Sequence, residues 1–201
     1  MIKNHIQLIY SARKTVYFLF AVLFLSAVYA IIPLKGNHIH AIAQTGAGLN
    51  KGAMVNFVFS RAPKSVPDLS FKHGSGQPVK LSQWRGKTVL LNLWATWCKP
   101  CREEMPDLNK LQISLGGDDF EVVAVSIDRK GAAASQKFLD EINVKSLALY
   151  VDETGKIYRD VRGYGLPVTI LIDRNGMEIG RLVGPAHWAS REAQALIKHV
   201  I

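Results

Sequence analysis

The chain has 201 residues with 25 basic and 16 acidic side chains, a net charge of +9, and only two cysteines. A length of this order predicts one domain plus an additional segment. Six basic residues and no acid precede position 63, so residues 63–201 carry 19 basic and 16 acidic side chains and a net charge of only +3. This excludes the basic stripe of a nucleic-acid-binding protein, and two cysteines are too few for a disulfide-stapled scaffold.

The first feature along the chain is an apolar run at residues 16–34, VYFLFAVLFLSAVYAIIPL, which only Ser26 interrupts. About 20 predominantly apolar residues span a bilayer core. We therefore expect a transmembrane signal-anchor at residues 15–34. A cleaved signal peptide is the alternative, with small residues suited to a cut after Ala30 or after Ala43.

Charge predicts the orientation of this anchor. Lys3, Arg13 and Lys14 lie in the short tail of residues 1–14, and basic tails of this kind stay cytoplasmic. The rest of the chain then lies across the membrane. Residues 35–62 lack a steady periodicity, so we expect a linker there and a folded domain over residues 63–201.

The linker carries one short motif. His38 and His40 form an H-x-H pair there. Two histidines make only half of a tetrahedral metal site, so we interpret them as part of a solvated segment.

Beyond residue 63, apolar runs of strand length alternate with segments of helical periodicity. The run at 87–95 is rich in Val and Leu after its lysine, which is typical of a strand buried on both faces. Asn175-Gly176 is typical of a tight hairpin turn, and Ser190 is a suitable helix cap. The pattern predicts an α/β sheet with helices on both faces. The expected strands are 87–95, 120–128 and 147–151, followed by a hairpin over 168–184, and the expected helices are 100–115, 132–142, 156–162 and 190–201.

Both cysteines lie in one C-x-x-C motif, Cys98 and Cys101, between the strand at 87–95 and the following helix. The N–H groups and positive dipole end of a helix N-terminus favour a thiolate at Cys98. Cys101 falls one turn further in. We expect Cys98 to attack a disulfide of another protein and Cys101 to resolve the mixed disulfide, without a cofactor.

Other roles for the cysteine pair are less well supported. An inert local disulfide closes too short a loop to stabilise the fold appreciably. Two thiolates supply half of a zinc site, and the domain holds no second ligand pair, so we expect no such metal centre. Copper(I) can be held by two thiolates alone, so a copper(I) carrier stays open as an alternative.

The segment WATWCKPC, with a strand before it and GLPVT downstream, resembles the thioredoxin superfamily. The segments VPDLSF, CREEMP, FEVVAVSID, GLPVTILIDRNG and GPAHWAS are similar to the TlpA/ResA-like branch of membrane-anchored thiol-disulfide oxidoreductases. The resemblance covers about residue 63 to the C-terminus. It implies a thioredoxin-like central mixed sheet flanked by helices, behind the N-terminal transmembrane anchor.

The resemblance also implies a setting and a role. The protein would be a single-pass protein of the bacterial inner membrane with its N-terminus cytoplasmic and its catalytic domain in the periplasm. It would reduce disulfides of periplasmic partners in cytochrome c maturation or cytochrome oxidase assembly, and a membrane electron donor would reduce it again. A disulfide-introducing oxidase is a further alternative, because the Lys-Pro dipeptide does not fix the reduction potential.

Individual roles carry over onto matching positions. Cys98 corresponds to the nucleophile and Cys101 to the resolving thiol. Pro167 corresponds to the family's cis-proline, and Leu166 before it would offer its backbone to an extended client peptide. Trp97 would form part of the client-facing surface.

One position departs from thioredoxin proper, which keeps a buried acid where this chain has Asn92. The branch instead carries an acid after the motif, matched here by Glu104. The resemblance implies that Glu104 is a proton acceptor or a modulator of the thiol pKa. The alternative is that Glu103 and Glu104 are solvated acids in the first helical turn, where the helix dipole favours them.

Overall fold

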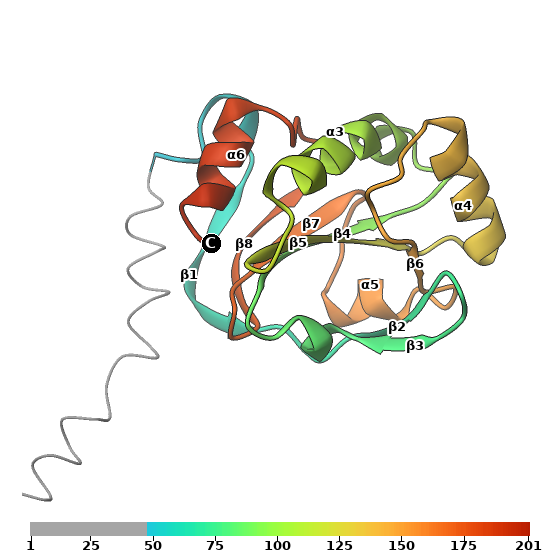
Figure 1. Ribbon diagram of the computed structural model, residues 1–201. Coiled ribbons are helices and arrows are strands. Elements are labelled where there is room, and N and C mark those ends of the chain that lie inside the picture. The colour runs from blue at the N-terminus through green and yellow to red at the C-terminus, as the bar shows by residue number, and fades with distance from the viewer. Residues whose placement is uncertain (1–47) are drawn as a thin grey trace, which may run out of the picture. The chain divides into compact units, whose positions relative to one another are not determined.

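The computed structural model describes residues 48–201 (Figure 1), which form a mixed sheet of eight strands in the order β1-β8-β7-β4-β5-β6-β2-β3. The pairs β4–β5 and β5–β6 are parallel and all other pairs are antiparallel. This confirms the mixed sheet. The strands are β1 (Val58–Ser65), β2 (Ser70–His73), β3 (Pro78–Lys80), β4 (Thr88–Trp94), β5 (Phe120–Ser126), β6 (Tyr150–Val151), β7 (Val168–Ile172) and β8 (Met177–Val183).

Four α-helices and two short 3-10 helices complete these residues. In Figure 1, α3, α4 and α6 cover one face of the sheet and α5 lies on the other. The helices are η1 (Gly52–Met54), η2 (Leu81–Trp84), α3 (Lys99–Leu115), α4 (Gly131–Glu141), α5 (Lys156–Asp160) and α6 (Arg191–Lys198).

The central strand β4 is buried along its whole length, as its apolar run predicts. Successive side chains of a strand point to opposite faces. Leu90 and Trp94 accordingly belong to the core beneath α3, α4 and α6. Leu91 and Leu93 belong to a second core, which includes Ile157 of α5. The sheet is therefore covered on both sides, and β4 ends with Trp94 just before the cysteine motif.

The predicted elements of the domain are present, with bounds that differ by a few residues. The helix after the cysteines begins at Lys99, and the strand predicted at 147–151 is reduced to Tyr150–Val151. Ser190 caps α6 as expected, because its Oγ accepts a hydrogen bond from the Ala193 N–H at 3.2 Å. The short strands β2 and β3 were not predicted.

The predicted boundary at residue 63 is wrong, because the folded domain already includes the end of the predicted linker. Strand β1 starts at Val58 and pairs antiparallel with β8. Met54 and Phe57, which precede it, are fully buried in the core beneath α3. Aperiodic residues are thus ordered here by their tertiary contacts.

The predicted tail, transmembrane anchor and first part of the linker, including His38 and His40, lie outside the described residues. Among residues 48–201, none of the helices has the length and apolar character that a membrane crossing requires.

Candidate functional site

Cys98 and Cys101 are joined by a disulfide at the start of α3. Cys98 is the N-cap residue of that helix, and its Sγ accepts a hydrogen bond from the Cys101 N–H at 3.3 Å. Cys98 is 6% exposed, whereas Cys101 is fully buried. Only Cys98 can therefore be reached by another molecule, and its sulfur lies where the unpaired N–H groups of the helix stabilise negative charge.

The loop before Cys98 is held by a buried carboxylate. Asp128 accepts hydrogen bonds from the Thr96 N–H at 3.3 Å and from the Thr96 hydroxyl, and also from the Lys130 N–H at 2.9 Å. Burial raises the pKa of Asp128, but these hydrogen bonds and the Lys130 charge outweigh it and leave the pKa below its ordinary value. The ionised Asp128 thus fixes the turn that presents Trp97 and Cys98.

A cavity of about 440 Å³ opens beside the exposed side of Cys98. Trp97 is 67% exposed at its rim, as the predicted client-facing role requires. Leu166, from the loop before β7, forms part of the wall. The rest of the wall is apolar or aromatic and consists of Pro100, Ile127 and Tyr158, for which no role in the site was predicted. We call this cavity the cysteine cavity.

The Leu166–Pro167 peptide bond is cis, as the resemblance implies. Pro167 is buried, and its carbonyl accepts a hydrogen bond from the Gly184 N–H at 2.8 Å. Within residues 48–201, neither the N–H nor the carbonyl of Leu166 forms a hydrogen bond. Both groups therefore remain available to an extended peptide beside Cys98.

Glu104 lies on α3 three residues after Cys101 and does not line the cysteine cavity. Its side chain is buried, with a residue exposure of 3%. Oε1 accepts a hydrogen bond from Asn92 Nδ2 at 2.7 Å. Oε2 accepts hydrogen bonds from the Ala186 N–H and from Trp188 Nε1, each at 3.1 Å. The alternative of a solvated first-turn acid is therefore wrong for Glu104. Glu103 is exposed and lies 3.9 Å from Lys99 Nζ, but it is the fifth residue of α3 and so lies beyond the first turn.

Burial, with a small contribution from the nearby Asp107 charge, raises the pKa of Glu104 to about 7. The three hydrogen bonds lower this pKa and offset only part of the increase. Glu104 is three residues after Cys101, so the two side chains share one face of α3. A carboxyl group that gains and loses a proton near neutral pH thus lies behind the resolving cysteine.

Sequence reasoning missed the partners that hold Glu104. Asn92 donates a hydrogen bond to Glu104 and another to Thr169 Oγ1, the latter at 2.9 Å. It thus supplies a hydrogen-bond donor at the position where thioredoxin proper keeps a buried acid. Ala186 and Trp188 come from the segment GPAHWAS, which carries part of the family resemblance but implied no role for any of its residues. A buried indole N–H usually has a hydrogen-bond acceptor, so Trp188 was the signal in the sequence for a buried acceptor nearby.

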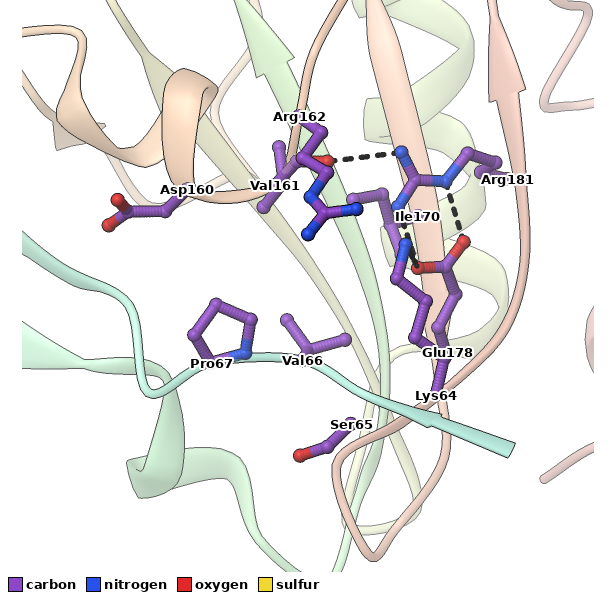
Figure 2. A pocket seen from close by; sticks show the side chains of 10 residues that line it. All are labelled: Lys64, Ser65, Val66, Pro67, Asp160, Val161, Arg162, Ile170, Glu178 and Arg181. Carbon is purple, nitrogen blue, oxygen red and sulfur yellow. Dashed lines mark hydrogen bonds and ion pairs between the residues drawn. The ribbon is translucent and has the colours of Figure 1, made fainter. Parts of the chain in front are cut away.

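A separate cavity of about 280 Å³ lies between β1, β8 and the end of α5, and shares no residue with the cysteine cavity (Figure 2). Three of its charged side chains, Lys64, Glu178 and Arg181, are paired with one another. Arg181 donates to both carboxylate oxygens of Glu178 at 2.6 Å and to the Val161 carbonyl at 3.1 Å. Lys64 Nζ lies 3.4 Å from Glu178. With no sulfur in its lining, this cluster supports the fold and not the redox chemistry.

No group of three or more His, Cys, Asp or Glu side chains that could hold a metal ion is found within the described part of the chain.

Comparison with known proteins places this geometry in a family. Residues 63–177 match the model of the AhpC/TSA family. The chain is 38% identical over 116 residues to the thioredoxin-like protein YneN of Bacillus subtilis, a match that covers 57% of this chain and 66% of that protein. It is 31% identical over 121 residues to the thiol-disulfide oxidoreductase ResA of Bacillus cereus, covering 60% of this chain and 69% of ResA. The chain thus spans about two thirds of the length of these relatives.

Solved structures give the same result. A Chlorobium tepidum protein assigned as a thiol:disulfide interchange protein DsbE superimposes with a TM-score of 0.62 at 31% identity, over 69% of this chain and 96% of that one. The exposed lipoprotein thioredoxin of Streptococcus pneumoniae superimposes with a TM-score of 0.54 at 25% identity, over 66% of this chain and 97% of that one. The chain therefore belongs to the AhpC/TSA family and, within it, to the TlpA/ResA-like thiol-disulfide oxidoreductases.

Proposed function

We propose that this protein is a membrane-anchored reductant of disulfides in periplasmic partner proteins, with Cys98 as the nucleophile and Cys101 as the resolving thiol. The observation that carries the proposal is the difference between the two sulfurs. Cys98 is the accessible N-cap of α3 beside an apolar cavity, and Cys101 is fully buried directly behind it.

The chemistry exchanges one disulfide for another. The Cys98 thiolate attacks a sulfur of the client disulfide, forms a mixed disulfide and releases one client thiolate. The Cys101 thiolate then attacks Cys98 Sγ, which forms the Cys98–Cys101 disulfide and releases the second client thiolate. Two electrons pass to the client, and the two protons lost by the cysteines are balanced by those that the client thiolates take up.

Glu104 serves the second step in this proposal. Cys101 must lose its proton in a site without solvent access, and the Glu104 carboxyl group on the same helix face has a pKa of about 7. A group with this pKa accepts and returns a proton at neutral pH. Glu104 either accepts the Cys101 proton or sets the pKa of that thiol through its charge.

The anchor at residues 15–34 and the cytoplasmic tail at 1–14 belong to the same proposal. The apolar length and the basic tail support a single-pass protein with its domain in the periplasm. An external donor must then return two electrons to the Cys98–Cys101 disulfide after each cycle, and we propose a membrane electron donor. We propose cytochrome c maturation or cytochrome oxidase assembly as the pathway that supplies the client.

Two variants test the cysteine assignment. The full chain in detergent, reduced and mixed with insulin, should reduce its disulfides. Cys101→Ser should accumulate a one-to-one mixed disulfide with a disulfide-containing peptide, whereas Cys98→Ser should form no adduct. Turnover by Cys98→Ser would contradict the assignment.

Deletion of the gene in the bacterium tests the proposed role in cytochrome c maturation or cytochrome oxidase assembly. Removal of the gene should lower covalently bound haem c or active cytochrome oxidase, and the wild-type chain should restore it where Cys98→Ser does not. Unchanged levels of both would contradict this part of the proposal.

A further inference from the structure

A second cavity continues from the cysteine cavity. It also measures about 440 Å³, and Trp97, Ile127 and Tyr158 line both. The two therefore form one groove, which we call the client groove. It runs from Cys98 across an aromatic and apolar middle to a far end between the start of α4 and α5.

Three positively charged residues, all exposed, line the far end of the client groove: Arg129, Lys130 and Arg159. Arg159 Nη1 donates to the Thr154 carbonyl at 3.1 Å. Neither Arg129 nor Lys130 forms an ion pair within residues 48–201. Neither side chain is therefore fixed in an ion pair, although the Lys130 charge acts on the neighbouring Asp128 carboxylate and lowers its pKa.

Two acids line the same end, but each is engaged elsewhere. Asp128 is 2% exposed and directs its carboxylate to Thr96 and to the Lys130 N–H. Glu153 lies 3.3 Å from Lys72 Nζ, a residue outside the groove lining. Three cations against these two carboxylates leave the lining of this end with a net charge of +1.

We infer that the protein selects client segments that carry an acidic residue several positions from the reactive cysteine. The inference rests on the proposed function. The client cysteine lies at Cys98, an apolar side chain packs on Trp97 and Tyr158, and the acidic side chain reaches Arg129 and Lys130. Two adjoining cavities of this size extend over roughly 10–20 Å, which is about three to six residues of extended chain.

The cations act mainly on the encounter. Opposite charges at the rim of an interface raise the association rate, and salt screens the effect. An acidic client should thus react faster at low ionic strength, while the thiol chemistry at Cys98 is unchanged.

Three peptides of equal length test the inference with the reduced full chain in detergent. Each contains one disulfide and carries Asp, Asn or Lys four positions before and four positions after the cysteines. We expect the Asp peptide to be reduced about tenfold faster than the Lys peptide at low salt, and the ratio to fall towards one at about 1 M salt. Equal rates for all three peptides would overturn the inference and leave the oxidoreductase function intact.

Variants assign the effect to the far end of the groove. The double variant Arg129→Glu/Lys130→Glu should reverse the preference between the Asp and Lys peptides. Lys80→Glu/Lys145→Glu makes the same change in net charge at exposed positions outside the groove and should keep the preference. If the first variant does not fold, Arg129→Gln/Lys130→Gln should abolish the preference. A preference that survives in the folded variant would overturn the inference.

A separate outcome concerns the proposed function. Failure to reduce any of the three peptides would contradict the reductase and not the groove. The affinities of peptides with serine in place of cysteine for the oxidised chain, measured by calorimetry, then decide the inference. Tighter binding of the Asp peptide supports it, and equal binding overturns it.

Discussion

Asn92 Nδ2 lies 2.7 Å from Glu104 Oε1, so a residue of the central strand holds a carboxyl group of α3, the helix that Cys98 caps and that contains Cys101. The Asn92 amide can do this without a charge of its own. Its Oδ1 is buried and has no hydrogen-bond partner within residues 48–201. The pair therefore places one titrating group, and not two, behind the disulfide.

Glu104→Gln should remove the pH dependence that this carboxyl group gives to stability. The folded pKa of Glu104 is raised from 4.5 to about 7, so its contribution is fully present below pH 4.5 and is lost as the pH rises to about 7. The loss is about 3 kcal/mol between these limits. Denaturant unfolding of the oxidised protein from pH 4 to 9 should show this decline in the wild type and a flatter profile in the variant.

The Glu104→Gln variant also tests whether this carboxyl group takes part in the thiol chemistry. Alkylation of the reduced cysteines should lose an inflection near pH 7 in Glu104→Gln. An unchanged pH profile of thiol reactivity would contradict a proton-accepting or pKa-setting role for Glu104.

Trp188→Phe should raise the pKa of Glu104 further, because it removes the indole N–H that donates to Oε2. The loss of one such hydrogen bond corresponds to about one pH unit. Infrared titration of the carboxyl band measures the midpoint directly.

Trp94→Phe is the matched control for this prediction. Trp94 is equally buried, but its Nε1 has no hydrogen-bond partner within the described residues. The same truncation should therefore leave the Glu104 midpoint unchanged. Equal midpoints in the two variants would show that the Trp188 N–H does not set this pKa.

Gly180→Ala should release the N-terminal part of the domain. A Cβ at position 180 would lie 2.6 Å from Phe57 Cε1 and from the Val58 carbonyl oxygen, closer than real side chains approach. Overpacking of this kind costs about 1–3 kcal/mol. Hydrogen exchange should show faster exchange in β1, and an unchanged exchange rate there would contradict the assigned packing. Gly117→Ala is a suitable control, because no atom lies within 4 Å of a Cβ placed there.

Glu178 should make the fold sensitive to acid. Burial raises the pKa of Glu178, but the hydrogen bonds and charge of Arg181, together with Lys64, outweigh it and hold the pKa below its ordinary value. Its contribution is therefore present above the unfolded pKa and is lost as the pH falls through the folded pKa.

Glu178→Gln should cost about 3 kcal/mol at pH 7, because it leaves the half-buried Arg181 guanidinium without its counter-charge. Denaturant unfolding at pH 7 measures this cost. The same measurement at pH 3 should find the difference between variant and wild type much smaller, and a constant difference would contradict this assignment.

The sequence predicted what local patterns encode. The buried strand β4, the helix after Cys98 and the turn at Asn175-Gly176 each follow from periodicity or turn chemistry over a few residues. It did not predict that residues 52–62 belong to the domain, because their order depends on contacts with β8 and the core far along the chain. The partners of Glu104 could not be predicted for the same reason, since Asn92 and Trp188 come from distant segments that only the fold brings together.

The reduction potential of the full chain in detergent, equilibrated against glutathione buffers, tests the central claim most directly. A reductant of partner disulfides should give a value at or below about −200 mV. A value near −120 mV would match a strong oxidant, contradict the proposed direction of electron transfer and identify the protein as a disulfide donor.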